Sequence, residues 1–202
     1  MGSRFRIASV AAVVVLVAVV AVVLLSGGDD PKPAAQAAQH GPLPPINGPA
    51  MEVEGLVYNV TDVRLLDADD PIAKPYLANL EAPTEDSGFL GVFLRVYNKT
   101  GKPQPSAPGF LLEPSKQPGL AEQNLASESP FSWVMGETVP AGGVLPAPGS
   151  RAASGAIPGA LLLYPVSDET IEAEPFDLVV HTAGGALAKL RLPKVPALKQ
   201  QG

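Results

Sequence analysis

Hydrophobic positions are distributed in two different ways along the chain. Near the N-terminus they form one block, residues 7–25, in which Ser9 is the single residue that is not apolar. Beyond residue 50 they recur in short, roughly alternating runs that glycine and proline separate. A long apolar block is typical of a membrane span, whereas short alternating runs are typical of β-strands with one buried face. The pattern therefore predicts one membrane-spanning segment followed by a β-rich domain.

The block at residues 7–25 has the length of a transmembrane helix. As a helix it would be about 28 Å long, close to the roughly 30 Å hydrocarbon core of a bilayer. Its many valines favour strands in water, but a lone strand in lipid cannot pair its backbone groups, whereas a helix can. Arg4 and Arg6 precede the block, and Asp29 and Asp30 follow it. The positive-inside rule therefore places the N-terminus in the cytoplasm and the remaining chain outside.

A cleaved export signal is the alternative interpretation of the same block. Such a signal has an apolar region of about 7–15 residues with a small-residue cleavage site close behind it. Here the block is longer, and the small-residue stretch at 34–38 lies well beyond its end. We therefore expect an uncleaved single-pass anchor, and a secreted protein released by cleavage stays open. A buried core helix is not favoured, because no large helical partner is visible downstream.

A proline- and glycine-rich segment, residues 26–50, separates the anchor from the alternating pattern. It shows no apolar periodicity and is expected to be a linker that holds the downstream domain off the membrane. His40 lies in it, and a lone linker histidine is expected to be solvated rather than a metal ligand. The predicted organisation is a cytoplasmic N-terminus at 1–6, a transmembrane helix at 7–25, the linker at 26–50, an outer domain at 51–196 and a tail at 197–202.

The strongest predicted strand of the outer domain is at residues 89–97. Leu90, Val92, Leu94 and Val96 share one face of this strand, and its other face is mixed. Further strands are expected at 56–65, 110–113, 131–134, 152–157, 161–164, 176–181 and 187–192, with a short helical turn within 118–127.

The spacing of these strands indicates an antiparallel β-sandwich. Several short strands with glycine and proline between them are typical of this architecture. Residues 182–186 predict a hairpin turn, because Gly184 and Gly185 adopt positive φ without strain. No long helix is expected after residue 50. We therefore expect a mainly β fold, an immunoglobulin-like antiparallel β-sandwich, behind one N-terminal transmembrane helix.

One order of features runs through the outer domain. In chain order it contains Val60-Thr61-Asp62-Val63 in an opening strand, a long acidic loop, a strong strand running into an Asn-Lys-Thr-Gly-Lys-Pro turn at 91–103, a Phe-Leu-Leu strand at 110–112, a Pro-Ala-Gly-Gly turn at 140–143, a small-residue strand at 152–157 and a Pro-Phe-Asp-Leu strand at 175–178. This order resembles the bacterial telokin-like extracytoplasmic domains of unknown function, over about two thirds of the chain. The resemblance implies an immunoglobulin-like fold behind a signal or lipid anchor, and it brings no catalytic motif. Residues 140–160 depart from the family, which usually has Pro-Gly-Glu and then a strand there.

Composition excludes several classes of function. The chain has no cysteine, so it has no disulfide, no zinc thiolate site, no cysteine nucleophile and no lipid-modified N-terminal cysteine. Its net charge of −6 argues against nucleic-acid binding, which requires a basic face. No glycine-rich phosphate loop follows a strand and opens a helix, so no nucleotide is expected. The hydrophobic share of 46% is too high for a disordered polyelectrolyte, and without the apolar block it becomes ordinary for a soluble domain.

The remaining residues that could carry chemistry are few. His181 ends a predicted strand, and no serine is marked as its partner in a nucleophilic site. Asp67, Asp69 and Asp70 form the densest acidic group, but the glycine and distal glutamate of a calcium loop are missing. We interpret this group as a solvated loop, with a weak calcium site as the alternative. The carboxylates Glu169, Glu172 and Glu174 are interpreted as solubilising residues in a loop before an edge strand.

Two further features have a structural and a functional interpretation. Trp133, the single tryptophan, could be a binding anchor, but a core position in the sandwich is favoured. Asn59-Val60-Thr61 and Asn98-Lys99-Thr100 match the N-glycosylation sequon, a triplet that is common by chance.

The sequence as a whole favours a non-catalytic binding or interaction module of the bacterial cell envelope. Its expected partners are the membrane, through the single-pass anchor, and a protein or envelope component bound through sandwich loops or an edge strand. No catalytic residue, cofactor or metal is expected. The alternatives are a secreted binding protein, an unrecognised hydrolase-type enzyme centred on His181 or the acidic loop, and a structural spacer.

Overall fold

The computed structural model describes residues 45–77, 80, 87–116, 122–126, 129–173 and 175–195. The expected N-terminus at 1–6, the expected span at 7–25, most of the linker with His40, and the tail at 197–202 lie outside these residues. The chain divides into two units, residues 1–39 and 40–202, and all described residues belong to the second. No helix among the described residues is both long enough and apolar enough to cross a bilayer.

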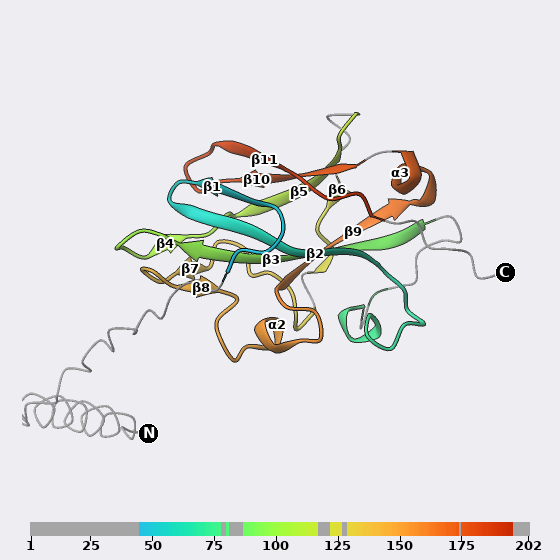
Figure 1. Ribbon diagram of the computed structural model, residues 1–202, viewed down its shortest axis with the longest axis horizontal. Helices are drawn as coiled ribbons and strands as arrows, with labels where there is room; N and C mark the ends of the chain where they lie inside the picture. Colours follow the sequence, from blue (N-terminus) through green and yellow to red (C-terminus); the bar gives the residue numbers. More distant parts are fainter. Residues whose placement is uncertain are drawn as a thin grey trace, which may run out of the picture. The chain divides into compact units, whose positions relative to one another are not determined.

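The first sheet is built around one long strand, β3 (Ser87–Asn98). Along one edge β3 pairs with β2 (Leu56–Leu66), which in turn pairs with β1 (Ala50–Val53). Along its other edge β3 pairs first with β9 (Ala160–Ser167) and then, near its end, with β8 (Val144–Leu145). All of these pairings are antiparallel (Figure 1).

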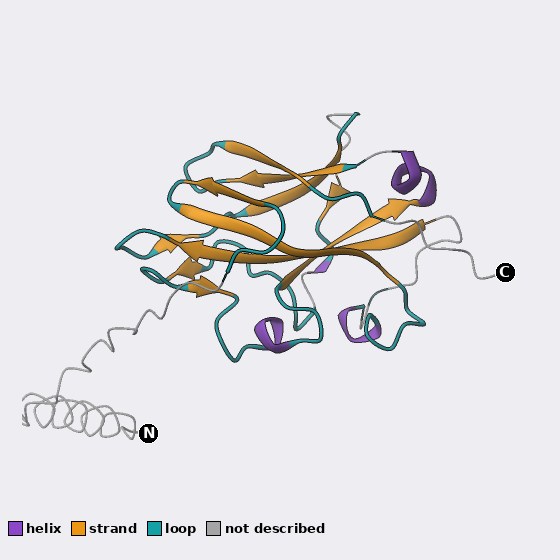
Figure 2. Cartoon of the chain, viewed as in Figure 1, coloured by secondary structure: helices purple, strands orange, loops and turns teal. Residues whose placement is uncertain are grey.

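The second sheet has the order β11-β10-β5-β6 and is also antiparallel. Its strands are β5 (Gly109–Pro114), β6 (Glu122–Gln123), β10 (Phe176–His181) and β11 (Leu187–Arg191), and a two-stranded sheet pairs β4 (Gln104–Pro105) with β7 (Thr138–Val139). Strands dominate the described residues (Figure 2), and the helices are short: η1 (Lys74–Tyr76), α2 (Arg151–Ser154) and α3 (Asp168–Ala173). The predicted mainly β, antiparallel architecture is therefore confirmed.

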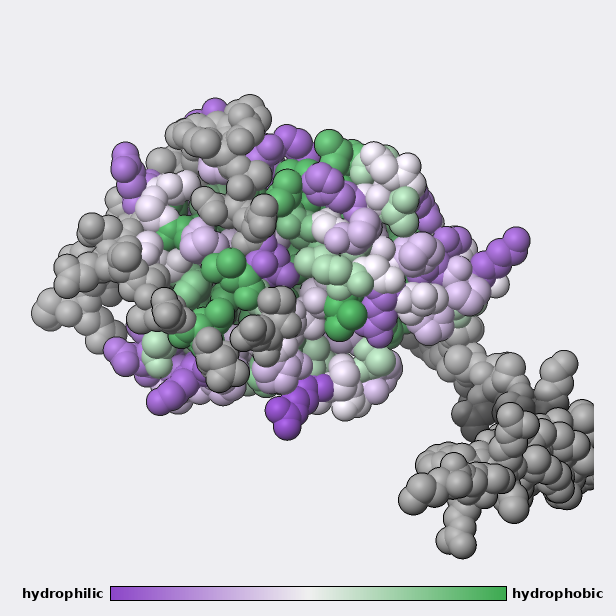
Figure 3. Space-filling model, turned by 180° about the vertical axis from the view of Figure 1, so that it is seen from behind, coloured by the Kyte–Doolittle hydropathy of each residue, from purple (hydrophilic) through white to green (hydrophobic). Residues whose placement is uncertain are grey.

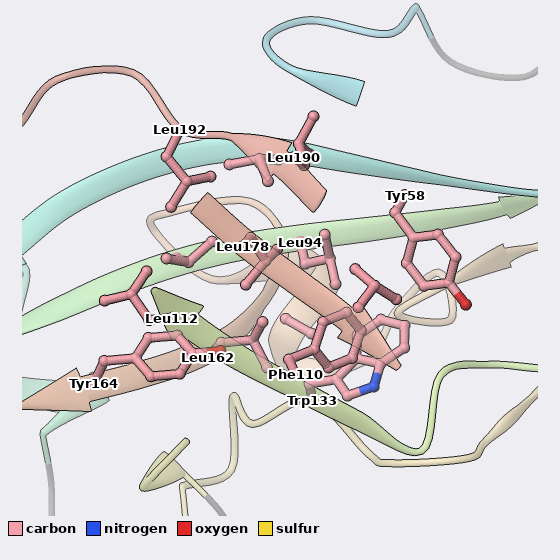
Figure 4. Packing of buried hydrophobic residues seen from close by; sticks show 14 of the residues in the cluster. Tyr58, Leu94, Phe110, Leu112, Trp133, Leu162, Tyr164, Leu178, Leu190 and Leu192 are labelled. Carbon is pink, nitrogen blue, oxygen red and sulfur yellow. The ribbon is translucent and has the colours of Figure 1, made fainter. Parts of the chain in front are cut away.

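The two larger sheets pack face to face, and side chains from both form one hydrophobic cluster. In Figure 4 Leu94 of the first sheet lies against Leu178 of the second. The ring of Tyr58 lies edge-on to that of Phe110, with their centroids 6.0 Å apart. Burying each large apolar side chain contributes about 1.5–3 kcal/mol to stability. The domain is thus held by core packing, with no disulfide to assist it.

A second hydrophobic cluster covers the opposite face of β3. Phe89 and Phe93, which the sequence places on a mixed face, are both buried there. Tyr76 of η1 packs edge-on against Phe93, with their ring centroids 5.2 Å apart, and its hydroxyl accepts a hydrogen bond from the Ile157 N–H at 2.8 Å. Loop segments outside the two sheets therefore remove this face of β3 from water.

The expected strand at 152–157 is wrong, because residues 151–154 form the helical turn α2. Ser150 caps this turn, since its side chain accepts a hydrogen bond from the Ala153 N–H at 3.2 Å. Alanine is also the best helix former, and the segment lacks the β-branched residues of a strand. The expected strand at 131–134 is wrong as well. In its place Ser132 forms an isolated parallel bridge with Leu161.

Other expectations hold with small differences. The strands predicted at 56–65, 89–97, 110–113, 161–164, 176–181 and 187–192 are β2, β3, β5, β9, β10 and β11. The hairpin turn at 182–186 is present, with the Thr182 N–H donating to the Ala186 carbonyl. Strand β1 was not predicted. Its two-residue turn to β2 places Glu54 at φ 52° and Gly55 at φ 78°, the positive values that such a hairpin needs.

Two substitutions on β9 test separately how core packing and a buried hydroxyl affect the free energy of unfolding. Leu162→Ala should lower the free energy of unfolding by about 2–5 kcal/mol, because it opens a cavity between the sheets. Tyr164→Phe should leave it unchanged or raise it by up to about 1 kcal/mol, since the buried Tyr164 hydroxyl has no described hydrogen-bond partner. Urea unfolding of the full chain in detergent, followed by Trp133 fluorescence, measures both. A large loss in Tyr164→Phe would contradict the packing described here.

Candidate functional site

The acidic loop after β2 uses its carboxylates to shape its own backbone. Asp67 accepts a hydrogen bond from the Asp69 N–H at 2.9 Å, and Asp70 accepts one from the Ile72 N–H at 2.8 Å. These are local turns of the kind that aspartate commonly stabilises. Within the described part of the chain no three metal-ligating side chains form a group that could hold an ion. The hydrogen bonds within the loop therefore explain its conformation.

The glutamates near residue 170 lie in a different setting from the one expected. Residues 168–173 form the helix α3, and the Ser167 side chain accepts a hydrogen bond from the Thr170 N–H at 3.2 Å at its start. Glu169 and Glu172 are on this helix, and Glu174 lies outside the described residues. The strand that follows, β10, lies between β5 and β11 and is not an edge strand. That part of the prediction is wrong.

Both sequon asparagines are structural. Asn59 is 1% exposed and donates hydrogen bonds to the carbonyls of Asn47, at 2.9 Å, and Pro49, at 3.2 Å. Asn98 is fully buried and donates to the carbonyls of Lys102, at 2.7 Å, and Val139, at 3.0 Å. A glycan needs a free, exposed amide nitrogen, and neither side chain offers one in the folded domain.

Trp133 is in the core, which the sequence favoured over a binding anchor. It is 4% exposed and packs edge-on against Phe110, with their ring centroids 5.7 Å apart. Figure 4 shows the two rings side by side between the sheets.

His181 lies at the end of β10 on the outer face of the second sheet, beside a surface hollow. The hollow has a volume of about 430 Å³. Its described lining residues come from β5, from the end of β10 and from the chain around 124 and 135; they are Pro108, Gly109, Phe110, Leu111, Asn124, Met135 and His181. We call it the His181 hollow. Sequence reasoning singled out His181 but none of the other residues that line it.

The chain makes the hollow by leaving β5 and returning to it. After β6, the Leu125 N–H donates to the Leu163 carbonyl of β9 at 2.7 Å, and the Asn124 side-chain oxygen accepts from the Leu163 N–H at 2.8 Å. The chain thus crosses from the second sheet to the first. It returns to the second sheet just before β5, where the Gly136 N–H donates to the Ala107 carbonyl at 3.2 Å. The hollow lies between these two points.

Phe110, which lines the hollow, belongs to a group of three aromatic residues in the core. Phe110 lies between Tyr58 and Trp133 and meets both rings edge-on. The Tyr58 hydroxyl accepts a hydrogen bond from the Ala107 N–H at 3.0 Å. Burial raises the pKa of Tyr58 to about 12, although the Ala107 hydrogen bond opposes this shift. This aromatic group is therefore uncharged at neutral pH.

The charges on this outer face lie away from the hollow. Arg191 pairs with Asp177, and Lys189 pairs with Glu113, toward the end of the sheet opposite His181. Of the residues that line the hollow, Met135 is the exposed large apolar one, at 39%. Figure 3 shows that apolar residues also reach the surface elsewhere, in patches between polar ones. In the sequence Met135 directly follows the strand expected at 131–134, and no pattern there indicated an exposed position beside a hollow.

The described lining of the His181 hollow offers mainly apolar surface and few ionisable groups. Among its described lining residues His181 is the single titratable group, and no carboxylate or hydroxyl lines the hollow with it. A nucleophilic site of the serine–histidine type requires such a partner within hydrogen-bond reach. Two smaller hollows are also present. One, of about 280 Å³, lies beside Ile46 and Tyr97, and one, of about 200 Å³, lies beside Trp133 and Pro146.

Comparison with known proteins gives two distant structural likenesses. No family model and no curated protein matches the chain. A candidate lipoprotein (ycdA) from Bacillus subtilis aligns at 12% identity and a TM-score of 0.47, over 73% of this chain and 39% of that one. A conserved hypothetical protein from Bacillus anthracis aligns at 13% identity and a TM-score of 0.45, over 71% of this chain and 92% of that one. The chain thus spans about two fifths of the length of the Bacillus subtilis protein. Neither likeness assigns an activity to it.

The buried amide of Asn98 gives a test of its structural role. Asn98→Asp should lower the free energy of unfolding by about 1–3 kcal/mol, because a carboxylate cannot donate to the Lys102 and Val139 carbonyls. The same change at the exposed Asn47, whose backbone carbonyl makes its described contact, should have no measurable effect. Denaturant unfolding of the two variants measures the difference. Equal stabilities would contradict the assignment.

Alkaline pH should destabilise the folded domain through the buried Tyr58. Its pKa of about 12 in the folded protein exceeds the value of about 10 in an unfolded chain. The protonated phenol is therefore favoured by folding, so its stabilisation is complete below about pH 10 and is lost as the pH rises through 12. Melting temperatures measured across this range should fall less steeply in Tyr58→Phe than in the parent chain. Parallel curves would show that Tyr58 does not contribute.

Proposed function

We propose that this chain is a single-pass membrane protein of the bacterial cell envelope with one outer binding domain. Residues 1–6 are cytoplasmic, residues 7–25 cross the membrane, residues 26–50 form the linker, and residues 51–196 form an immunoglobulin-like, telokin-like sandwich outside. The apolar block, the arginines before it and the resemblance to telokin-like domains support this arrangement. Two antiparallel sheets packed face to face are compatible with the immunoglobulin-like fold.

The domain binds a protein partner of the envelope through the His181 hollow. The observation that carries this proposal is the hollow itself, an apolar depression with Met135 half-exposed at its margin. Methionine is common on binding surfaces because its flexible, polarisable side chain adapts to different partners. Tethering confines the domain to a thin layer next to the bilayer, which raises its effective concentration for partners in the same membrane.

The binding is non-catalytic, and no metal, cofactor, nucleotide or nucleic acid takes part. Support comes from the lining of the hollow, where His181 lacks a described partner for acid–base or nucleophilic chemistry. A released, secreted binding protein is the second candidate, favoured only if residues 7–25 are removed. A hydrolase centred on His181 and a passive spacer are the remaining alternatives.

Site-specific photo-crosslinking in native membranes tests both the location and the site. A photoreactive residue at position 135 should give a discrete crosslinked adduct, whereas one at Ile72, an exposed apolar residue of the acidic loop, should not. Intact mass of the membrane-extracted chain should show that residues 1–25 are retained. Equal crosslinking at the two positions, or none at 135, would favour the spacer. Loss of residues before Ser26 would establish release.

A further inference from the structure

Strand β5 has one fully paired edge and one edge that is paired only in its middle. Along the first edge, β10 pairs with all six residues from Gly109 to Pro114. Along the second edge, β6 pairs with Leu111 and Leu112 only. The two residues nearest the His181 hollow, Gly109 and Phe110, therefore have no described strand beside them on this edge.

The crossing of the chain between the sheets causes this gap. If β6 continued, residues 124 and 125 would lie beside Phe110 and Gly109. Instead Asn124 and Leu125 bond to Leu163, and further along the Trp133 N–H donates to the Leu161 carbonyl at 3.0 Å. These contacts close the edge of β9. The same residues that close the edge of β9 thus leave part of the edge of β5 open.

The open edge presents backbone hydrogen-bonding groups to the hollow. In a strand, successive residues direct their N–H and C=O groups to opposite sides. One of Gly109 and Phe110 therefore directs both groups away from β10 and toward the hollow. Elsewhere the edges of this sheet are protected, since β6 is only two residues long and β11 carries the charged Lys189 and Arg191.

Size and charge restrict what could occupy this edge. The hollow beside this edge has a volume of only about 430 Å³. An extended chain rises about 3.3 Å per residue and places alternate side chains on one face, so one or two of them fill such a space. The described lining residues carry no fixed charge, so a charged side chain buried against them would lose its hydration without gaining a partner among them.

We infer that the open edge of β5 at Gly109 and Phe110 takes an extended segment of a partner protein as an added antiparallel or parallel strand. The segment places an uncharged, apolar side chain in the His181 hollow against Met135 and Leu111. This inference rests on the proposed binding function and names its mode. Backbone hydrogen bonds supply the attachment, and the hollow selects the side chain.

The test uses the full chain in detergent and a capped six-residue peptide of alternating valine and threonine with a fluorescent label. Binding is measured by fluorescence anisotropy and by exchange of backbone amide hydrogens. The peptide should bind saturably, and exchange should slow at Gly109 or Phe110. The same peptide with N-methyl groups on its central three residues keeps its side chains but loses the backbone donors. Its affinity should be lower by about tenfold or more.

Protein variants locate the site independently of the peptide chemistry. Met135→Asp places a charge at the hollow and should weaken binding by about tenfold or more, whereas Ile72→Asp, the same kind of change in the acidic loop, should not. Gly109→Val suits a strand and fills the hollow, because a Cβ there meets only the His181 side chain, at 3.8 Å or more. It should also weaken binding while the melting temperature stays close to that of the parent chain.

Three outcomes would overturn the inference. They are a lack of saturable binding up to the solubility limit of the peptide, an N-methylated peptide that binds as tightly as the unmodified one, and a Met135→Asp variant that binds the peptide as tightly as the parent chain. Peptide-independent protection of Gly109 and Phe110 that rises with protein concentration would indicate a second copy of this chain as the occupant. Crosslinking at position 135 in membranes without strand-like peptide binding would leave the binding function standing and refute only its mode.

Discussion

Burial of β3 on both faces is the constraint on which the rest of the structure depends. Its inner face lies in the core between the sheets, and its outer face, with Phe89 and Phe93, lies under the second cluster. Its edges are also occupied, by β2 on one side and by β9 and β8 on the other. A strand surrounded in this way is apolar along nearly its whole length, as strands covered on both faces are in other folds. The second sheet and the loop segment around Tyr76 are the two layers that this strand requires.

The strands that could be predicted are those long enough to show a period of two. β2 and β3 have eleven and twelve residues, which is long enough for an apolar face to be recognised from the sequence alone. β4, β7 and β8 have two residues each, too few for any period to be visible. The error at α2 has a different cause. A run of small residues is compatible with either conformation, and a single hydrogen bond from a cap at Ser150 decided between them.

The second cluster and the His181 hollow could not be predicted, because both arise where segments far apart in sequence meet. Tyr76 and Ile157 are far apart in the sequence, and nothing near either of them indicates that hydrogen bonds join them. The hollow depends on Asn124, whose side-chain oxygen takes the place of a backbone carbonyl beside β9. Asparagine in a loop can stabilise a turn or bond to a distant backbone group, so its position in the sequence does not show that it bonds to β9. His181 was visible as a residue, but its surroundings were not.

The hydrogen bonds of the Asn59 side chain have a mechanical consequence. Its amide group holds the carbonyls of Asn47 and Pro49, and the Val60 N–H also donates to the Pro49 carbonyl at 2.9 Å. These bonds lie upstream of the β1–β2 ladder, at the point where the chain enters the domain. A pulling force on the preceding segment therefore reaches this small group of hydrogen bonds before it reaches any strand pairing. The force at which β1 begins to separate from β2 therefore depends on the buried Asn59 amide together with the Val60 backbone bond beside it.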